Sequence, residues 1–314
     1  MDAYPVVMPL DDPRCRTPGL VGASVAIMAA AGAAAGGAGV AAGAAAGAGG
    51  AAAATGAAGA AAAGAAGAAA TVAVPPAVVA TAVVPAWAAY LRSGRGPEVL
   101  LAGAAHAVPM PVSLRGWLVG GGAGGRRDRG IGPPLRNLDA AAAAEAVIEL
   151  VALAGHVDGD ALLAIRLQAY LAVDASVIVL AGPAAEILLV RACWGHPEDL
   201  GAGVHYDRLW LGTAGLSVRR SEVVDKPTAT VAADGGTHTV GVAPQWRSSP
   251  VIPDAALASS IAATALRLAS RLGHAVELEL GIAPSRLHLI DADPFDADPF
   301  RADPFRDDVT SPHF

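Results

Sequence analysis

The clearest alternation of apolar and polar residues lies near the C-terminal end of the chain. In "AVELEL" (275–280) valine and leucine side chains alternate with Glu277 and Glu279, and this period of two predicts a strand with one buried face. The turn "APSR" and the apolar run "LHLI" (287–290) follow, and they predict a partner strand that closes a hairpin. We therefore expect both glutamates on the same face of this hairpin.

Two stretches place apolar residues at helical spacing between capping residues. Asp139 precedes apolar positions that recur over roughly 140–154, and Gly155 is expected to end this helix. Asp254 precedes a leucine-rich stretch that ends at Gly273, and glycine is the usual residue in the left-handed position after a helix. We expect a capped helix in each place.

Shorter apolar runs between Asp, Gly and Pro residues predict buried strands. They lie in the segments "TVAVPPAVVATAVVP", "ALLAIRLQAYLAV", "SVIVLAG", "EILLVRACWG", "DRLWLG" and "TATVAADGGTHTVGV". In the last segment Asp234-Gly235-Gly236 is expected to form a hairpin turn, and "AWAAYL" predicts a short helix. Strands and helices mixed in this order indicate an α+β protein.

Two segments hold too few large apolar side chains to form a core. Residues 29–70 are almost only alanine and glycine, and residues 295–314 repeat Asp-Pro-Phe units in an acidic context. Such segments bury little surface to offset their ordering entropy, so we interpret them as a low-complexity insertion and a disordered tail. No charged residue occurs between Thr17 and Leu91. Alanine is nearly neutral for membrane insertion and glycine is less favourable, so we expect no membrane span.

Composition, charge and the absence of certain motifs argue against several classes of function. The net charge is −7 and no Lys/Arg stripe is present, so nucleic acid is not an expected partner. Cys15 and Cys193 lie far apart in the sequence, which argues against a disulfide framework and favours a cytoplasmic protein. Walker, H-E-x-x-H and G-x-S-x-G motifs are all absent, so neither a P-loop, a zinc site nor an α/β-hydrolase is expected.

The end of the chain resembles a known family. A Gly-Gly hairpin, a helix ending in Gly273 and the run "AVELEL…RLHLIDADP" resemble the end of the nucleotide-binding domain of phosphoenolpyruvate synthase and pyruvate phosphate dikinase. The family pattern there is "G-x-P-x-D-I-E-W-A" followed by "L-Y-x-x-Q-A-R-P". Glu277 and Glu279 stand for its Asp and Glu, and Asp291 and Asp293 stand for its Gln and Arg.

Further matches occur upstream in the same order. The stretch "ACWGHPEDLGAGVHYDRLWL" resembles the family's "G-L-G-E…G…D-x-Y", with Glu198 at the glutamate. Lys226 matches a lysine after that strand, and Gln168 matches the glutamine of "V-V-Q-x-M-V". Ser24 stands for the lysine of "V-G-G-K". The resemblance covers most of the chain and is most specific over 160–294.

The resemblance implies an α+β, ATP-grasp-like two-lobe fold that carries the Ala/Gly insertion and the disordered acidic tail. The implied divisions are 1–28 for the start of the N-terminal lobe, 29–70 for the insertion, 71–158 for the remainder of that lobe, 159–294 for the C-terminal lobe and 295–314 for the tail.

The resemblance also implies ATP and Mg²⁺ as ligands. In the family the two lobes clamp ATP and magnesium, and the phosphoryl group finally reaches a histidine on a separate domain. Neither the phosphohistidine segment nor the barrel domain of the family follows Pro294, so the implied acceptor is a histidine on a partner chain. No residue is assigned a catalytic role.

The implied site residues divide by ligand group. Glu279 and Asp291 are the expected Mg²⁺ ligands, because carboxylate oxygens suit this ion, and Gln168 is expected beside the adenine. Glu198 and Lys226 are expected near the phosphates. The Gly-rich loop "GGGAGGRRDRG" is expected to bind phosphate through its backbone amides and the charges of its arginines. These arginines are Arg126, Arg127 and Arg129.

Other interpretations stay open. Glu277 and Glu279 can be the solvated face of a hairpin, Lys226 a surface lysine, Glu198 a turn cap and the arginine loop a mobile connection. Because Asp293 replaces the family's Arg, the protein can also be a degenerate, inactive nucleotide-binding or regulatory member. A third possibility is an interaction protein that recruits partners through its Asp-Pro-Phe repeats, and the alternative there is repeat slippage in the gene.

Overall fold

The computed structural model describes residues 5–10, 12–16, 26, 28–29, 72–93, 96–119, 129–157, 161–198, 205–283 and 286–294. The chain folds into two compact units. The first unit takes in Val74–Leu171, the N-terminal strand and the short segment Ala232–Thr237, and the second takes in Ala172–Val231 and the chain from His238 onward. Each unit contains an antiparallel sheet and helices, so the protein is a mixed α+β structure.

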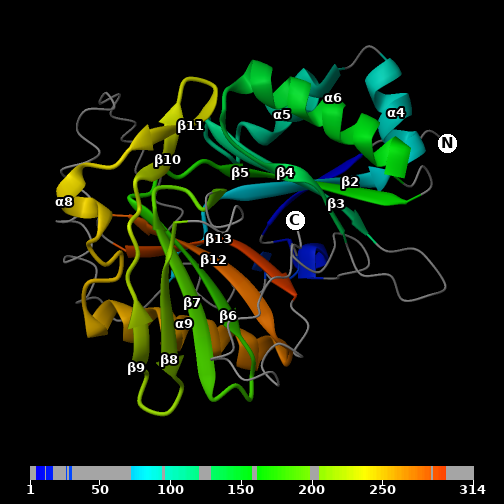
Figure 1. Cartoon of the computed structure of the whole chain (residues 1–314). Coiled ribbons are helices and arrows are strands. Elements are labelled where there is room, and N and C mark those ends of the chain that lie inside the picture. Colours follow the sequence, from blue (N-terminus) through cyan, green and yellow to red (C-terminus); the bar gives the residue numbers. More distant parts are fainter. Residues whose placement is uncertain are drawn as a thin grey trace. The chain divides into compact units, whose positions relative to one another are not determined.

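The first unit is a five-stranded antiparallel sheet in the order β1-β2-β5-β3-β4, with helices α4, α5 and α6 on one of its faces (Figure 1). The bounds of its elements are β1 Val6–Pro9, the 3-10 turn η1 Pro13–Arg16, β2 Ala77–Val83, α4 Val84–Arg92, α5 Gly96–Ala104, β3 Val112–Val119, β4 Arg129–Leu138, α6 Ala140–Val157 and β5 Leu162–Ala169.

The core of the first unit forms between this sheet and its helices. Alternate residues of β5, including Leu163 and Ile165, are fully buried there, together with Val147 of α6. Trp87 of α4 is also fully buried, and its indole Nε1 donates a hydrogen bond to the carbonyl of Leu163 at 3.1 Å. A buried tryptophan needs such a partner, so this bond fixes α4 on the sheet.

Helix α6 is the one described helix that is long and apolar enough to cross a membrane. Its buried residues, among them Ala143, Val147, Leu150 and Ala154, pack into the core of the first unit. This packing accounts for much of its apolar character. The uncharged stretch between Thr17 and Leu91 lies largely outside the described residues.

The second unit is built on a six-stranded antiparallel sheet in the order β13-β12-β6-β7-β8-β9. Helix α9 packs against β6, β8 and β9 (Figure 1). The bounds of its elements are β6 Ala175–Ala181, β7 Ile187–Trp194, β8 Asp207–Gly212, β9 Ser217–Glu222, α8 Pro244–Arg247, α9 Ala255–Leu272, β12 Val276–Ala283 and β13 Arg286–Pro294. Strands β10 Thr228–Ala233 and β11 Gly236–Gly241 form a separate two-stranded hairpin, whose segment Ala232–Thr237 belongs to the first unit.

Both caps predicted for helix α9 are confirmed. The Asp254 carboxylate accepts a hydrogen bond from the Leu257 amide at 2.7 Å, and Gly273 ends the helix in the left-handed conformation with φ 72°. Asp139 likewise accepts from the Ala142 amide at 2.8 Å at the start of α6. These side chains satisfy amides that a helix end leaves without intrahelical partners.

Three expectations differ from the structure. Helix α6 continues past Gly155 to Val157, because a glycine costs a helix only about 1 kcal/mol when neighbouring turns pack in a core. The end of the predicted Gly-rich loop is strand, since β4 begins at Arg129. The first compact unit continues to Leu171, whereas the sequence-based division begins the C-terminal lobe at 159.

A β-bulge sets the register of the terminal hairpin. Glu279 lies opposite Asp291, but the next residue, Leu280, lies opposite Leu289, so Ile290 is the extra residue of β13. The side chain of Ile290 packs over Gly281, where an added Cβ would lie 2.7 Å from the Ile290 Cδ1 atom and 2.5 Å from the Val173 Cγ1 atom. The bulge therefore depends on glycine at position 281.

We predict that Gly281→Ala destabilises the protein by about 1–3 kcal/mol, because the new methyl group overpacks this site. Gly241→Ala is the matched control, since no atom lies within 4 Å of a Cβ added there. The free energies of unfolding of both variants can be measured by urea denaturation. Equal stabilities for the two variants would show that the bulge does not need Gly281.

Candidate functional site

The predicted metal ligands face each other across the terminal hairpin. Glu279 of β12 and Asp291 of β13 are direct cross-strand partners, and Glu277 and Asp293 form the neighbouring pair on the same face. Directly opposed residues of an antiparallel pair have Cβ atoms about 4.5–5.5 Å apart. The structure therefore brings together two residues that are twelve positions apart in the sequence.

The carboxylate of Asp291 is held in place by its surroundings. Asp291 is only 4% exposed, and its Oδ1 atom accepts a hydrogen bond from the backbone amide of Ala292 at 2.9 Å. Glu279 is half-buried, while Val276, Leu278 and Leu280 point to the opposite, fully buried face. The predicted alternation of this strand is thus confirmed.

The carboxylate pair offers oxygen ligands of the type that Mg²⁺ prefers. No group of three or more His, Cys, Asp or Glu residues in the described part of the chain is arranged to hold a metal ion. Two carboxylates are enough where a nucleotide is present, because Mg²⁺ in such sites takes its other ligands from phosphates and water. The pair formed by Glu279 and Asp291 suits a metal that arrives with a phosphate-bearing ligand.

A buried hydroxyl lies one pleat further along the same face of the sheet. Ser176 of β6 is directly opposite Gly281 on one side and Cys193 on the other. It is fully buried, and its Oγ atom has no hydrogen-bond partner among the described residues. A buried polar atom of this kind usually has a partner, so Ser176 adds a polar group beside the carboxylate pair.

Lys226 is buried in an ion pair in the second unit. Its side chain is 0% exposed, and its Nζ donates to Asp207 Oδ1 at 2.5 Å and to the Val224 carbonyl at 2.8 Å. The other oxygen of Asp207 accepts from the Val251 amide at 2.8 Å. The structure therefore gives Lys226 a buried carboxylate partner, where the sequence indicated either a phosphate-binding or a surface lysine.

Gln168 lies in the first unit, on β5, with Ser113 and Ala77 as its cross-strand neighbours. It is 2% exposed, and neither its Oε1 nor its Nε2 atom has a hydrogen-bond partner within the described ranges. An amide buried in this way loses the hydrogen bonds it made to water. A ligand that supplies both a donor and an acceptor would satisfy it.

The remaining predicted residues are either exposed or outside the described residues. Glu198 is exposed and follows the segment of Gly195 and His196, which pairs with Thr230. Arg126 and Arg127 lie outside the described residues, as does Ser24. The low-complexity insertion lies almost wholly outside them, and so does the Asp-Pro-Phe tail.

Sequence reasoning missed the polar residues on the inner strands of the second sheet. Ser176 begins the apolar run "SVIVLAG", and Arg191 interrupts the run "EILLVRACWG". Each occupies one of the alternate positions that face away from α9. A single charged residue inside an otherwise apolar strand is the signal that would have identified Arg191. The runs were instead interpreted as uniformly buried strands.

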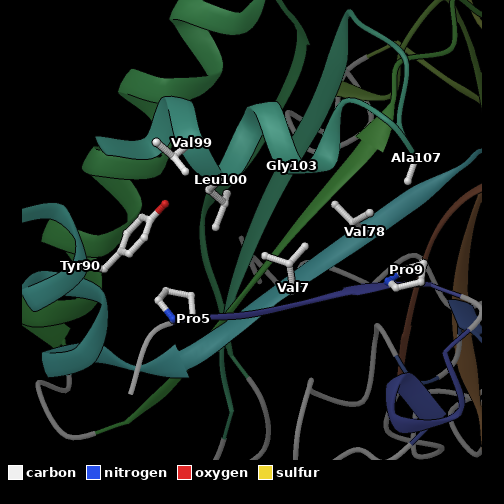
Figure 2. Close-up of a pocket in the computed structure, with 9 residues that line it drawn as sticks. All are labelled: Pro5, Val7, Pro9, Val78, Tyr90, Val99, Leu100, Gly103 and Ala107. Atoms are coloured by element: carbon white, nitrogen blue, oxygen red, sulfur yellow. The ribbon is translucent and has the colours of Figure 1, made fainter. Parts of the chain in front are cut away.

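An apolar hollow of about 430 Å³ lies in the first unit, and it contains none of the predicted site residues. Figure 2 shows it between strand β1, with Val7 and Pro9, and helices α4 and α5, with Tyr90 and Leu100. A second hollow of about 270 Å³ lies beside the start of α9 and includes Asp207. Neither hollow includes the carboxylate pair.

Comparisons with known proteins give a weak structural match. No protein-family model matches the chain, and no curated protein matches it. Among solved structures, the ATP-grasp ligase PsnB complexed with a minimal precursor matches at 10% identity with a TM-score of 0.24. The match covers 73% of this chain and 49% of that one, so the aligned region is about half the length of the ligase.

We predict that Lys226→Met destabilises the protein by about 3–5 kcal/mol, because it leaves the Asp207 carboxylate buried without its cation. The control is Glu222→Gln, which removes the carboxylate that pairs with two exposed arginines, Arg208 at 3.6 Å and Arg220. Exposed ion pairs contribute about 0–1 kcal/mol. Chemical denaturation measures both, and similar losses for the two variants would contradict a stabilising role for the buried pair.

His288 predicts a pH dependence of stability. Burial, with a smaller effect of the Arg286 charge, lowers the pKa of His288 from 6.5 to about 4. The unfolded chain therefore binds a proton more readily than the folded protein between these values, and stability falls as the pH drops from about 6.5 to 4. In His288→Gln this part of the pH dependence should disappear. Parallel stability profiles of the two proteins over this range would refute the assignment.

Proposed function

We propose that this protein binds ATP together with Mg²⁺, and that Glu279 and Asp291 hold the metal. The observation that carries the proposal is their direct cross-strand pairing on one face of the terminal hairpin, with Asp291 buried and fixed by the Ala292 amide. Two carboxylates at this spacing can bind one hard cation from the same side. The phosphates of the nucleotide would complete its coordination.

The neighbouring pair strengthens the attraction for a cation. Glu277 and Asp293 lie opposite each other on the same face as Glu279 and Asp291. Four carboxylates on two adjacent strands offer several oxygen ligands to a cation on one face. A divalent ion held there would allow a triphosphate to approach the carboxylates.

Within the first unit, Gln168 is a group of the kind that binds a nucleotide base. Its buried amide has one acceptor and one donor group without partners among the described residues, and a purine base presents both kinds of group along its edge. Small-molecule sites combine apolar walls with a few such polar groups. Gln168 is flanked in its strand by Leu167 and Ala169, and Leu167 belongs to the core.

The finer proposal is transfer of a phosphoryl group from ATP to a histidine on a partner chain, in the cytoplasm. It is supported by the similarity of "AVELEL…RLHLIDADP" to the phosphoenolpyruvate synthase type of nucleotide-binding domain. Phosphoryl transfer needs mainly positioning and charge neutralisation. A metal held by the carboxylate pair would supply the larger part of both. We assign no side chain the role of general base or nucleophile.

A second candidate is a protein that binds the nucleotide without turning it over. Asp293 favours it, because this carboxylate occupies the position of an arginine in the resembling family and lies opposite Glu277. A carboxylate about 4 Å from a phosphate repels it by about 4 kcal/mol at an effective dielectric of about 20. Measurement of ATP hydrolysis, and of phosphate transfer to added histidine-containing domains, separates the two candidates.

We predict that Glu279→Ala and Asp291→Asn each weaken Mg²⁺-ATP binding at least tenfold, about 1.4 kcal/mol or more. The reason is the loss of a direct metal ligand. Titration calorimetry of the full chain with ATP, in the presence of Mg²⁺ and again with EDTA, measures the effect. Glu186→Ala is the matched control, since Glu186 is an exposed glutamate of the same unit.

The outcomes of this titration are distinct. No binding of ATP to the wild-type chain refutes the proposed function. Binding that is unchanged in Glu279→Ala and Asp291→Asn places the nucleotide elsewhere. Binding that is lost in EDTA and in both variants, but not in Glu186→Ala, supports a metal held by the carboxylate pair.

A further inference from the structure

One row of directly opposed side chains crosses the whole sheet of the second unit. Its register is Asp291–Glu279–Ile178–Arg191–Arg208–Glu222, from β13 to β9. Directly opposed residues of antiparallel strands project from the same face of a sheet. The carboxylate pair and two arginines therefore share one face of one rigid unit, with Ile178 between them.

The two arginines are both placed against one aromatic ring. The guanidinium carbon of Arg191 lies 5.4 Å from the ring centre of Tyr206, and that of Arg208 lies 5.3 Å from it. Tyr206 is 9% exposed and packs with Cys193, and Ile178 packs against both. The ring is thus anchored in the sheet, and it limits where the two guanidinium groups can lie.

A cation–π contact leaves the hydrogen-bond donors of an arginine available. The attraction acts between the ring face and the charge of the guanidinium group. The N–H donors lie in its plane and point outward, in a fork that fits two oxygens of a phosphate. Arg191 and Arg208 therefore combine a fixed position with donors that an oxyanion can reach.

The charges in this part of the row do not cancel. Like charges placed directly opposite each other on neighbouring strands destabilise a sheet, and Arg191 and Arg208 are such a pair. Among the described residues, the carboxylate found beside them is Glu222, which lies 3.6 Å from Arg208 and also pairs with Arg220. Arg208 and Arg220 thus share one carboxylate, and an additional anion would stabilise Arg191 and Arg208.

We propose that Arg191 and Arg208 form a subsite for a phosphate group on the face of the sheet that carries the carboxylate pair. Neighbouring strands are about 4.8 Å apart, so the backbone of Arg191 is about 10 Å from that of Glu279. Ile178 lies between these two residues in the row. The subsite's position next to a metal-bound nucleotide rests on the proposed function, whereas the anion binding itself does not.

The phosphate can come from two sources. It can belong to the nucleotide, whose phosphates would extend from the metal toward the arginines, or to a second substrate that receives the transferred group. Both sources require the same two guanidinium groups. Competition between free phosphate and Mg²⁺-ATP distinguishes them.

The test is an NMR titration of the full chain with inorganic phosphate, with sodium chloride added to hold the ionic strength constant. Wild type is compared with Arg191→Gln, Arg208→Gln and the double variant. Arg271→Gln is the matched control, because Arg271 is an exposed residue near the end of α9, on the covered side of the sheet. Circular dichroism and thermal unfolding check that each variant is folded.

We expect phosphate to shift the arginine Nε–H signals of the wild type and of Arg271→Gln. The apparent Kd should rise about tenfold in each single Arg191 or Arg208 variant, as for the loss of a charge-assisted hydrogen bond. Phosphate that still binds at saturating Mg²⁺-ATP assigns the subsite to a second substrate. Displacement by Mg²⁺-ATP, with weaker ATP binding by the arginine variants, assigns it to the nucleotide.

Two results would overturn the subsite. One is a wild-type chain that shows no response to phosphate beyond that to chloride. The other is equal phosphate binding by the wild type and the double variant. Failure of the proposed function gives a different pattern. Glu279→Ala then has no effect on ATP binding, whereas phosphate still shifts the arginine signals of the wild type.

Discussion

The register of β12 against its two neighbours is the constraint on which the candidate site depends. Because side chains alternate along a strand, a slip of one residue would turn Glu277 and Glu279 toward the face that α9 covers. The buried leucines and valine of β12 oppose this slip, since they would then leave the core on the α9 side of the sheet. The bulge at Ile290 shifts the register by one residue, so that Asp291, rather than Ile290, lies opposite Glu279. Gly281 permits that bulge. Packing on the buried face of β12 thus determines that the glutamates lie on its other face.

The buried pair of Lys226 and Asp207 holds a different part of the second unit. Asp207 begins β8, and its two oxygens accept from the amides of Val224 and Val251 as well as from Lys226. One carboxylate therefore connects three segments that are distant in the sequence. Burying two charges carries a large desolvation cost, which these additional hydrogen bonds offset. Lys226 is positioned by this network, and a ligand is not needed to explain its burial.

Local signals in the sequence were enough to predict much of the second unit. The capping residues Asp254 and Gly273 define α9 because each satisfies backbone groups at its own end of the helix. The alternation in 275–280 predicted β12 and the face of its glutamates. In contrast, β9 escaped prediction because its six residues are almost all exposed and contain no apolar alternation. Its place in the sheet comes from pairing with β8, which no local pattern encodes.

Pairing between strands also explains which parts of the site could not be predicted. Glu279 and Asp291 were both expected to bind metal, but their direct opposition depends on a bulge that the sequence does not mark. The role of Arg191 depends on still more distant pairings, since β6 separates it from β12. Seen along the strand, it is one charge in an apolar run. Across the sheet it belongs to a row with carboxylates at one end and arginines toward the other.

A ligand with a cation and a phosphate along its length complements this separation of charge, and Mg²⁺-ATP is such a ligand. The polarity of the row would orient it, with the metal over β12 and β13 and negative charge toward β7 and β8.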